Sequence, residues 1–97
     1  MQDLQDAIGL WSDATFGEGD RYLGILEKLK EEVQELLDDP MNDDEMADCF
    51  IILLDAARKR GMYINDILAV CYDKLEVCKK RKWGPVDKNG KCQHIEE

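Results

Sequence analysis

Four carboxylates are spaced so that they could share divalent metal ions. Glu32 and Glu35 are three residues apart in the chain, and so are Glu45 and Asp48. On an α-helix, residues at i and i+3 lie about 60° apart around the axis, so each pair occupies one face. If consecutive antiparallel helices carry the two pairs, all four side chains meet at one end of a hairpin. Carboxylate oxygens are the ligands that Mg²⁺ and Mn²⁺ prefer, so this spacing indicates a metal site.

Asp48 is the acid whose position favours a function most. It directly precedes the most apolar run of the chain, Cys49–Leu54. An ionised carboxylate at the edge of a core needs a partner, and because its expected neighbours are acids, a bound cation is the simplest one. For Glu32 and Glu35 alone, an ordinary solvated helix face stays an alternative. Glu31 lies about 100° around the helix from Glu32, and we expect it outside the ligand set.

Other charged residues could contact a nucleotide. Lys74 and Arg81 are seven residues apart and share a helix face, which suits phosphate binding, although the helix dipole alone also favours cations there. Asp55 precedes Arg58 by three residues. A structural ion pair or subunit contact and a nucleotide contact are both open for Asp55.

Four helices and a tail must position these residues. Apolar residues at helical spacing and the breakers between them predict helices over about 3–14, 20–37, 43–60 and 65–82. The third helix is apolar nearly all round and should be the buried central one. We expect one all-α domain over 1–97, with 84–97 as a polar tail. The expected N-caps are Asp20, Asn42 or Asp43, and Asn65, and the expected residue after the third helix is Gly61.

Size and charge exclude several classes of protein. A chain of 97 residues buries a small core, so self-association is expected. The net charge is −9, from 22 acids against 13 bases, which argues against a nucleic-acid-binding protein. The longest apolar run is too short to span a membrane. The N-terminus has no secretory pattern, and three of the four cysteines lie in apolar stripes, so we expect a cytoplasmic protein.

The order of several motifs resembles a known family. Glu31 to Glu35, followed by Glu45 to Asp48, resembles the E-E-x-x-E … E-x-x-D signature of the MazG-like all-α NTP pyrophosphohydrolases. More specifically, the chain resembles the phage and bacterial dATP/dGTP pyrophosphohydrolases. The matching elements are W-x-x-x-T-F at Trp11 to Phe16, L-x-x-E-x-x-E-L at Leu29 to Leu36, the acidic element from Glu45 to Arg58, Lys74 with Arg81 and Trp83, and Gly90 to Ile95.

This resemblance implies a four-helix MazG-like bundle, assembled as a homodimer or homotetramer with sites near subunit interfaces. It implies hydrolysis of a (d)NTP, dATP or dGTP by preference, to the monophosphate and pyrophosphate, in the host cytoplasm if the source is viral. The cofactor would be Mg²⁺, with Mn²⁺ as a substitute. The metal ligands would be Glu32, Glu35, Glu45 and Asp48; the catalytic residues would be Glu35 and Asp48; the substrate contacts would be Lys74, Arg81, Trp11, Phe16 and Asp55.

Two features depart from the family pattern. The segment between Glu35 and Glu45 is short, and Cys78 occupies a position where relatives commonly have asparagine. Substrate preference is therefore open, and a pyrimidine triphosphate or phosphoribosyl-ATP stays an alternative. An acidic helical protein that binds a partner or a metal without catalysis is the other class. The position of Asp48 beside two glutamates is what argues for the enzyme.

Overall fold

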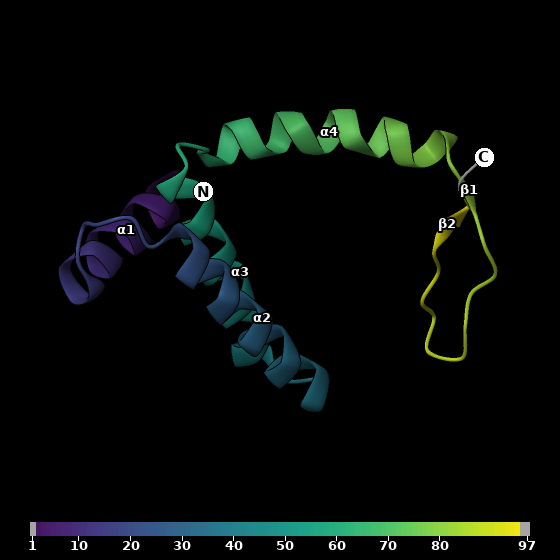
Figure 1. The fold of residues 1–97 in the computed structure, drawn as a ribbon, viewed down its shortest axis with the longest axis horizontal. Helices are drawn as coiled ribbons and strands as arrows, with labels where there is room; N and C mark the ends of the chain where they lie inside the picture. Colours follow the sequence, from purple (N-terminus) through teal and green to yellow (C-terminus); the bar gives the residue numbers. More distant parts are fainter. Residues whose placement is uncertain (1, 96–97) are drawn as a thin grey trace. The chain divides into compact units, whose positions relative to one another are not determined.

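The computed structural model describes residues 2–95. Four helices are followed by a short antiparallel hairpin (Figure 1). The chain divides into two compact units, with the boundary between Ile67 and Leu68; the expectation of a single domain stays a prediction. The elements are α1 (Gln2–Phe16), α2 (Tyr22–Asp38), α3 (Asp43–Lys59), α4 (Ile64–Lys80), β1 (Lys82–Trp83) and β2 (His94–Ile95).

A tight turn joins α2 to α3 and sets them side by side as an antiparallel hairpin (Figure 1). Asn42 is the N-cap of α3: its Oδ1 accepts hydrogen bonds from the backbone N–H groups of Asp44 and Glu45. Its Nδ2 donates to Asp39 Oδ2 at 2.9 Å. The predicted Asn42 cap is thus confirmed, and the turn fixes where Glu45 begins its helix.

The end of α3 is a Schellman motif. Gly61 has a φ of +79°, a conformation that glycine adopts without steric cost. The N–H of Met62 donates to the carbonyl of Ala57 at 2.9 Å, and that of Gly61 donates to the carbonyl of Arg58 at 3.0 Å. Gly61 therefore ends the helix as the sequence predicted.

A small core joins α1, α3 and the start of α4. Ile8, Leu54 and Ile64 are buried there. Beside them, Gln5 is fully buried. Its Nε2 donates to the carbonyls of Leu54 and Met62, and its Oε1 accepts from the N–H of Ile64. Gln5 thus satisfies three backbone groups where α3 passes into α4.

Three sequence predictions about helix ends were wrong. Arg21, not Asp20, is the N-cap residue of α2, and it makes no side-chain cap bond; Asp20 Oδ1 instead accepts from the N–H of Tyr22. The fourth helix already includes Asn65, and Asp66 Oδ2 accepts from the N–H of Tyr63. That helix ends at Lys80, because the chain turns there into β1.

The prediction of a fully buried third helix was also wrong for this chain. Phe50 and Leu53 keep 44% and 49% of their surface exposed, while Leu54 keeps 2%. The burial falls on the face toward α1 and α2, because α3 packs against those two helices in its unit.

The second unit contains most of α4 and the hairpin, whose second strand lies in the expected polar tail. Lys82 pairs with Ile95, and Trp83 pairs with His94. The indole N–H of Trp83 donates to the carbonyl of Cys78 at 2.9 Å, which holds β1 against the end of the helix. Among the described residues, no helix is long and apolar enough to cross a membrane.

Candidate active site

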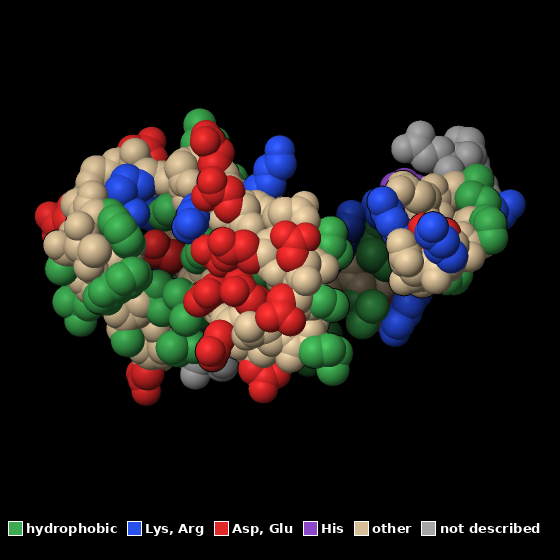
Figure 2. Space-filling view, turned by 90° about the horizontal axis from the view of Figure 1, so that it is seen from below, with side chains coloured by type: hydrophobic (Ala, Val, Ile, Leu, Met, Phe, Trp, Pro, Cys, Tyr) green, Lys and Arg blue, Asp and Glu red, His purple; other side chains and the backbone are tan. Residues whose placement is uncertain are grey.

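Three of the four predicted metal ligands converge. Glu32 and Glu35 on α2 and Glu45 on α3 each offer one carboxylate oxygen, and these oxygens all lie within 4.8 Å of one another. The i, i+3 spacing aligns the two α2 acids, and the Asn42 turn brings Glu45 opposite them. Acidic side chains gather on the face of the molecule shown in Figure 2.

The convergence leaves carboxylate oxygens without partners. Among residues 2–95, Glu32 Oε2 and Glu45 Oε2 are buried and accept no hydrogen bond. A buried unpaired carboxylate oxygen is costly unless a proton or a cation satisfies it. Oxygen ligands in this number and spacing fit a hard divalent cation such as Mg²⁺ or Mn²⁺.

Asp48, the fourth predicted ligand, is not among the residues whose carboxylate oxygens converge within 4.8 Å. It is exposed on α3. The apolar run that follows it includes the buried Leu54, while Phe50 and Leu53 stay half exposed. The charge of Asp48 nevertheless acts on the Cys49 thiol, as do the charges of the three converging acids. The pKa of the Cys49 thiol is raised by burial and then by the charges of Glu32, Asp48, Glu45 and Glu35. All four acids thus contribute to the electrostatic environment of Cys49, and the role of Asp48 as a ligand stays a prediction.

Lys28 is the cation that contacts this acidic group. Its Nζ lies 3.4 Å from Glu32 Oε1 and 3.5 Å from Glu31 Oε2. The hydrogen bond with Glu32 and the charge of Glu31 raise the pKa of the ammonium. Sequence reasoning missed Lys28, although its i, i+4 spacing to Glu32 was a readable signal.

An apolar cavity of about 550 Å³ reaches Lys28, the residue that contacts Glu32. Its walls include the side chains of Ile25, Ile51 and Ile52, with Lys28 also in the lining. Trp11 and Phe16, which the resemblance implies as substrate contacts, both line it, and their rings meet edge to face with centroids 5.4 Å apart. An apolar slot with aromatic edges and a few polar groups is typical of a small-molecule site.

Asp55 lies in the cavity wall and is 7% exposed. Its Oδ2 accepts from Ser12 Oγ at 2.6 Å, and its Oδ1 accepts from Arg58 Nη2 at 2.9 Å. The structural ion pair with Arg58 is thus confirmed. A nucleotide contact stays open, since the same carboxylate borders the cavity.

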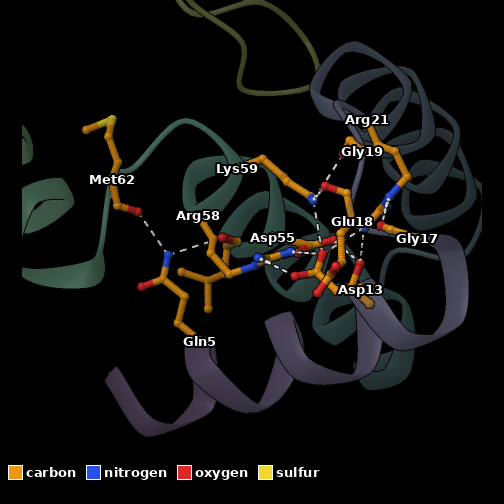
Figure 3. A network of polar contacts seen from close by, with 12 residues as sticks. Gln5, Asp13, Gly17, Glu18, Gly19, Arg21, Asp55, Arg58, Lys59 and Met62 are labelled. Atoms are coloured by element: carbon orange, nitrogen blue, oxygen red, sulfur yellow. Dashed lines mark hydrogen bonds and ion pairs between the residues drawn. The ribbon is translucent and has the colours of Figure 1, made fainter.

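Asp55 belongs to a wider polar network that the sequence did not predict (Figure 3). Asp13 on α1 pairs with Arg58 and with Lys59 of α3. Arg21 donates to Ser12 and Asp13, and its guanidinium lies 5.5 Å from the ring centroid of Phe16. The network therefore fixes the segment that carries Trp11 and Phe16.

Lys74 and Arg81, predicted to bind phosphates, lie in the second unit. Lys74 is exposed on α4, and Arg81 is half-buried directly after that helix. Cys78 occupies the position where relatives commonly have asparagine. It is a free, half-buried cysteine, and its backbone carbonyl accepts a hydrogen bond from the indole N–H of Trp83. The phosphate role of the two cations stays a prediction.

Comparisons with known proteins agree with this geometry. The family model for dATP/dGTP pyrophosphohydrolase matches residues 4–97. A dATP/dGTP diphosphohydrolase of Salmonella phage PMBT28 is 35% identical over 97 residues, which cover 98% of this chain and 31% of that protein. The chain thus spans about a third of that relative's length.

A solved structure resembles the fold. The MazG-like pyrophosphohydrolase of cyanophage S-2L, bound to dGDP and three catalytic Mn²⁺ ions per active site, matches with a TM-score of 0.78 and 31% identity. The match covers 97% of this chain and 95% of that one. The predicted four-helix MazG-like fold is confirmed, and the chain belongs to the dATP/dGTP pyrophosphohydrolase family.

Proposed function

We propose that this chain is a metal-dependent pyrophosphohydrolase that converts dATP or dGTP to the monophosphate and pyrophosphate. The observation that carries the proposal is the group formed by Glu32, Glu35 and Glu45, with two buried oxygens lacking partners, and an apolar cavity that reaches Lys28. Membership of the dATP/dGTP pyrophosphohydrolase family and the dGDP and Mn²⁺ bound by the cyanophage structure support it.

Each residue would have a role that follows from its position. Glu32, Glu35, Glu45 and Asp48 would hold Mg²⁺, or Mn²⁺ in its place. Bound divalent ions would offset the triphosphate charge and lower the pKa of a water molecule. Glu35 is exposed at the edge of the group, so its carboxylate is placed to take the proton of the attacking water.

The purine would occupy the cavity that reaches Lys28. Trp11 and Phe16 are more than half exposed at its edge, where their rings can cover a planar base. Asp55 offers a hydrogen-bond acceptor from the wall. Lys74 and Arg81 would bind the outer phosphates that leave as pyrophosphate. Because nucleoside triphosphates are cytoplasmic metabolites, the proposal places the protein in the cytoplasm, or in the host's cytoplasm if its source is viral.

Self-association as a homodimer or homotetramer is part of the proposal. Large apolar side chains stay exposed on all four helices of the single chain, and a chain of this size gains stability by covering them. The exposed residues include Leu23, Val33 and Leu37 on α2, Met46, Phe50 and Leu53 on α3, and Leu68, Tyr72 and Leu75 on α4. Light scattering across a range of concentrations would give the assembly state.

A panel of the common NTPs and dNTPs, each with Mg²⁺ or Mn²⁺, tests the activity. We expect dATP or dGTP to yield the monophosphate and pyrophosphate, separated by chromatography, and a chelator to abolish the reaction. Exclusive turnover of a pyrimidine nucleotide would correct the substrate. No monophosphate from any nucleotide would leave a metal-binding or partner-binding protein and overturn the proposal.

A further inference from the structure

Lys28 lies where the acidic group and the apolar cavity meet. It precedes Glu32 by one helical turn on α2, and its Nζ is 3.4 Å from Glu32 Oε1. The same side chain lines the cavity together with Ile25 and Asp55. One ammonium therefore borders both the place proposed for the metals and the place proposed for the base.

Only one of the two cations in the cavity lining is free to move. Arg21 donates to the carbonyl of Gly17, to Ser12 and to Asp13, so its guanidinium is fixed. Lys28 makes ion pairs of 3.4 and 3.5 Å, and its side chain is 55% exposed. Ion pairs of this kind contribute little to stability, so the ammonium can turn toward a ligand at small cost.

A nucleotide that occupies both the cavity and the acidic group must place one phosphate near Lys28. With the base in the cavity and the outer phosphates at the acids, the sugar and the α-phosphate lie between them. A cation bound by Glu32 would neutralise the partner that Lys28 now has. An ammonium is a compact charge with three rotatable donors, which suits a phosphate oxygen in a changing position.

We propose that Lys28 binds the α-phosphate of the substrate, which is the single phosphate of the monophosphate product. The inference rests on the proposed function and adds a phosphate contact distinct from Lys74 and Arg81. It predicts that Lys28 distinguishes a nucleotide from a nucleoside at this site.

The test compares ligands that differ by that phosphate alone. The full chain with saturating Mn²⁺ is titrated by calorimetry with deoxyadenosine, deoxyguanosine and their 5′-monophosphates. The wild type should bind a monophosphate more tightly than its nucleoside. Lys28→Met should lose about 10- to 100-fold of monophosphate affinity, the usual effect of a hydrogen bond to a charged group, and keep the nucleoside affinity. Lys28→Arg should restore most of the difference.

Lys30→Met is the matched control, because Lys30 is exposed on the same helix and does not line the cavity. It should behave like the wild type. Mn²⁺ affinity, measured by electron paramagnetic resonance, should be equal or higher in Lys28→Met, since the ammonium no longer competes for Glu32. A lower Mn²⁺ affinity would show that Lys28 only shapes the acidic group, and would overturn the inference.

The outcomes distinguish a failure of this inference from a failure of the proposed function on which it rests. If the wild type releases pyrophosphate from a dNTP but Lys28→Met keeps its full preference for the monophosphate, the role of Lys28 is wrong and the proposed function stands. If the wild type releases pyrophosphate from no nucleotide, both are overturned.

Discussion

Arg58 on α3 holds Asp13 on α1 through two parallel hydrogen bonds, Nη1 to Oδ2 at 3.1 Å and Nη2 to Oδ1 at 2.9 Å. Burial opposes the charge of Arg58, but its hydrogen bonds with Asp13 and Asp55 outweigh that effect and raise its pKa. Lys59 adds a second cation 3.0 Å from Asp13. This arrangement ties the helix that carries Trp11 to the helix that carries Glu45, so it supports the site without belonging to it.

The Asp13 pair should make stability depend on pH in the acid range. Hydrogen bonds from Arg58 and then Lys59 lower the pKa of Asp13 from 3.8 to about 2. A carboxyl whose pKa is lower in the folded state contributes its full stabilisation above the unfolded value, and loses it as the pH falls toward the folded value. Asp13→Asn removes this contribution, so the two proteins should differ in unfolding temperature at pH 6 and converge between about pH 4 and 2.

Thermal unfolding followed by circular dichroism at several pH values would measure this convergence. Asp73→Asn, at an exposed position on α4, is the control and should follow the wild type throughout. A gap between Asp13→Asn and the wild type that stays constant from pH 6 to 2 would contradict the argument.

Gly9 should be intolerant of a side chain. A Cβ at Gly9 would lie 2.5 Å from Arg58 Cδ and 2.6 Å from its Nε, and the guanidinium is fixed by Asp13 and Asp55. Alanine is otherwise the better helix former by about 0.5–1 kcal/mol. We expect Gly9→Ala to lower the free energy of unfolding by about 1–3 kcal/mol through overpacking.

Gly24→Ala gives the matched comparison by urea denaturation. Gly24 lies inside α2, and beyond its chain neighbours and the nearby helix backbone no atom lies within 4 Å of an added Cβ, so this variant should gain stability. Equal gains in both variants would mean that Arg58 moves aside freely, and that its network with Asp13 is not a rigid one.

Local signals in the sequence predicted the parts of the site that depend on one helix and one turn. The i, i+3 acids and the Asn42 cap bring Glu32 and Glu45 together, because helical geometry converts spacing directly into position. Gly61 likewise ends α3 through a local backbone conformation.

The contacts between distant helices were not predictable in this way. Glutamine is a residue type usually found at the surface, and only tertiary packing gives Gln5 three backbone partners. Asp13 could pair with many cations, and the fold brings Arg58, Lys59 and Arg21 to it. An apolar run such as Cys49–Leu54 predicts burial but does not say what covers it, and in the single chain Phe50 and Leu53 remain half exposed.

Cys49 should report the charge of the acids around it. Its pKa is raised by burial and then by Glu32, the first of the four neighbouring charges, and only the thiolate reacts with iodoacetamide. Glu32→Gln keeps the shape of the side chain and removes the charge. We expect metal-free Cys49 to alkylate about two- to fivefold faster at pH 8 in this variant.

Peptide mass spectrometry would give the alkylation rate of each cysteine in one sample. The exposed Cys71 is the internal control and should react equally in both proteins. An unchanged rate at Cys49 would mean that the charge of Glu32 does not act on the thiol.

Glu45→Gln should weaken metal binding and stabilise the metal-free protein. Glu45 Oε2 is buried without a partner and lies in the group with Glu32 and Glu35. Removing one like charge should stabilise the metal-free protein by about 1 kcal/mol. The rise in unfolding temperature on adding Mn²⁺ should shrink, because a ligand stabilises only by binding the folded state. Glu27→Gln, exposed on α2, should keep the full rise; a full rise in Glu45→Gln would remove Glu45 from the ligands.

Glu35→Gln and Asp48→Asn should each abolish turnover without unfolding the chain. Loss of a general base lowers kcat by about 100- to 10,000-fold, and Glu35, the exposed member of the converging group, is the proposed base. Asp48→Asn is the sharper test, since Asp48 is exposed and is not one of the three converging acids. Glu31→Gln, at the position expected outside the ligands, should keep most activity.

Rates of pyrophosphate release, with circular dichroism as the folding check, would decide the assignment. If both Glu35→Gln and Asp48→Asn stay active, the catalytic site lies elsewhere; if Glu31→Gln fails as they do, Glu31 joins the ligands.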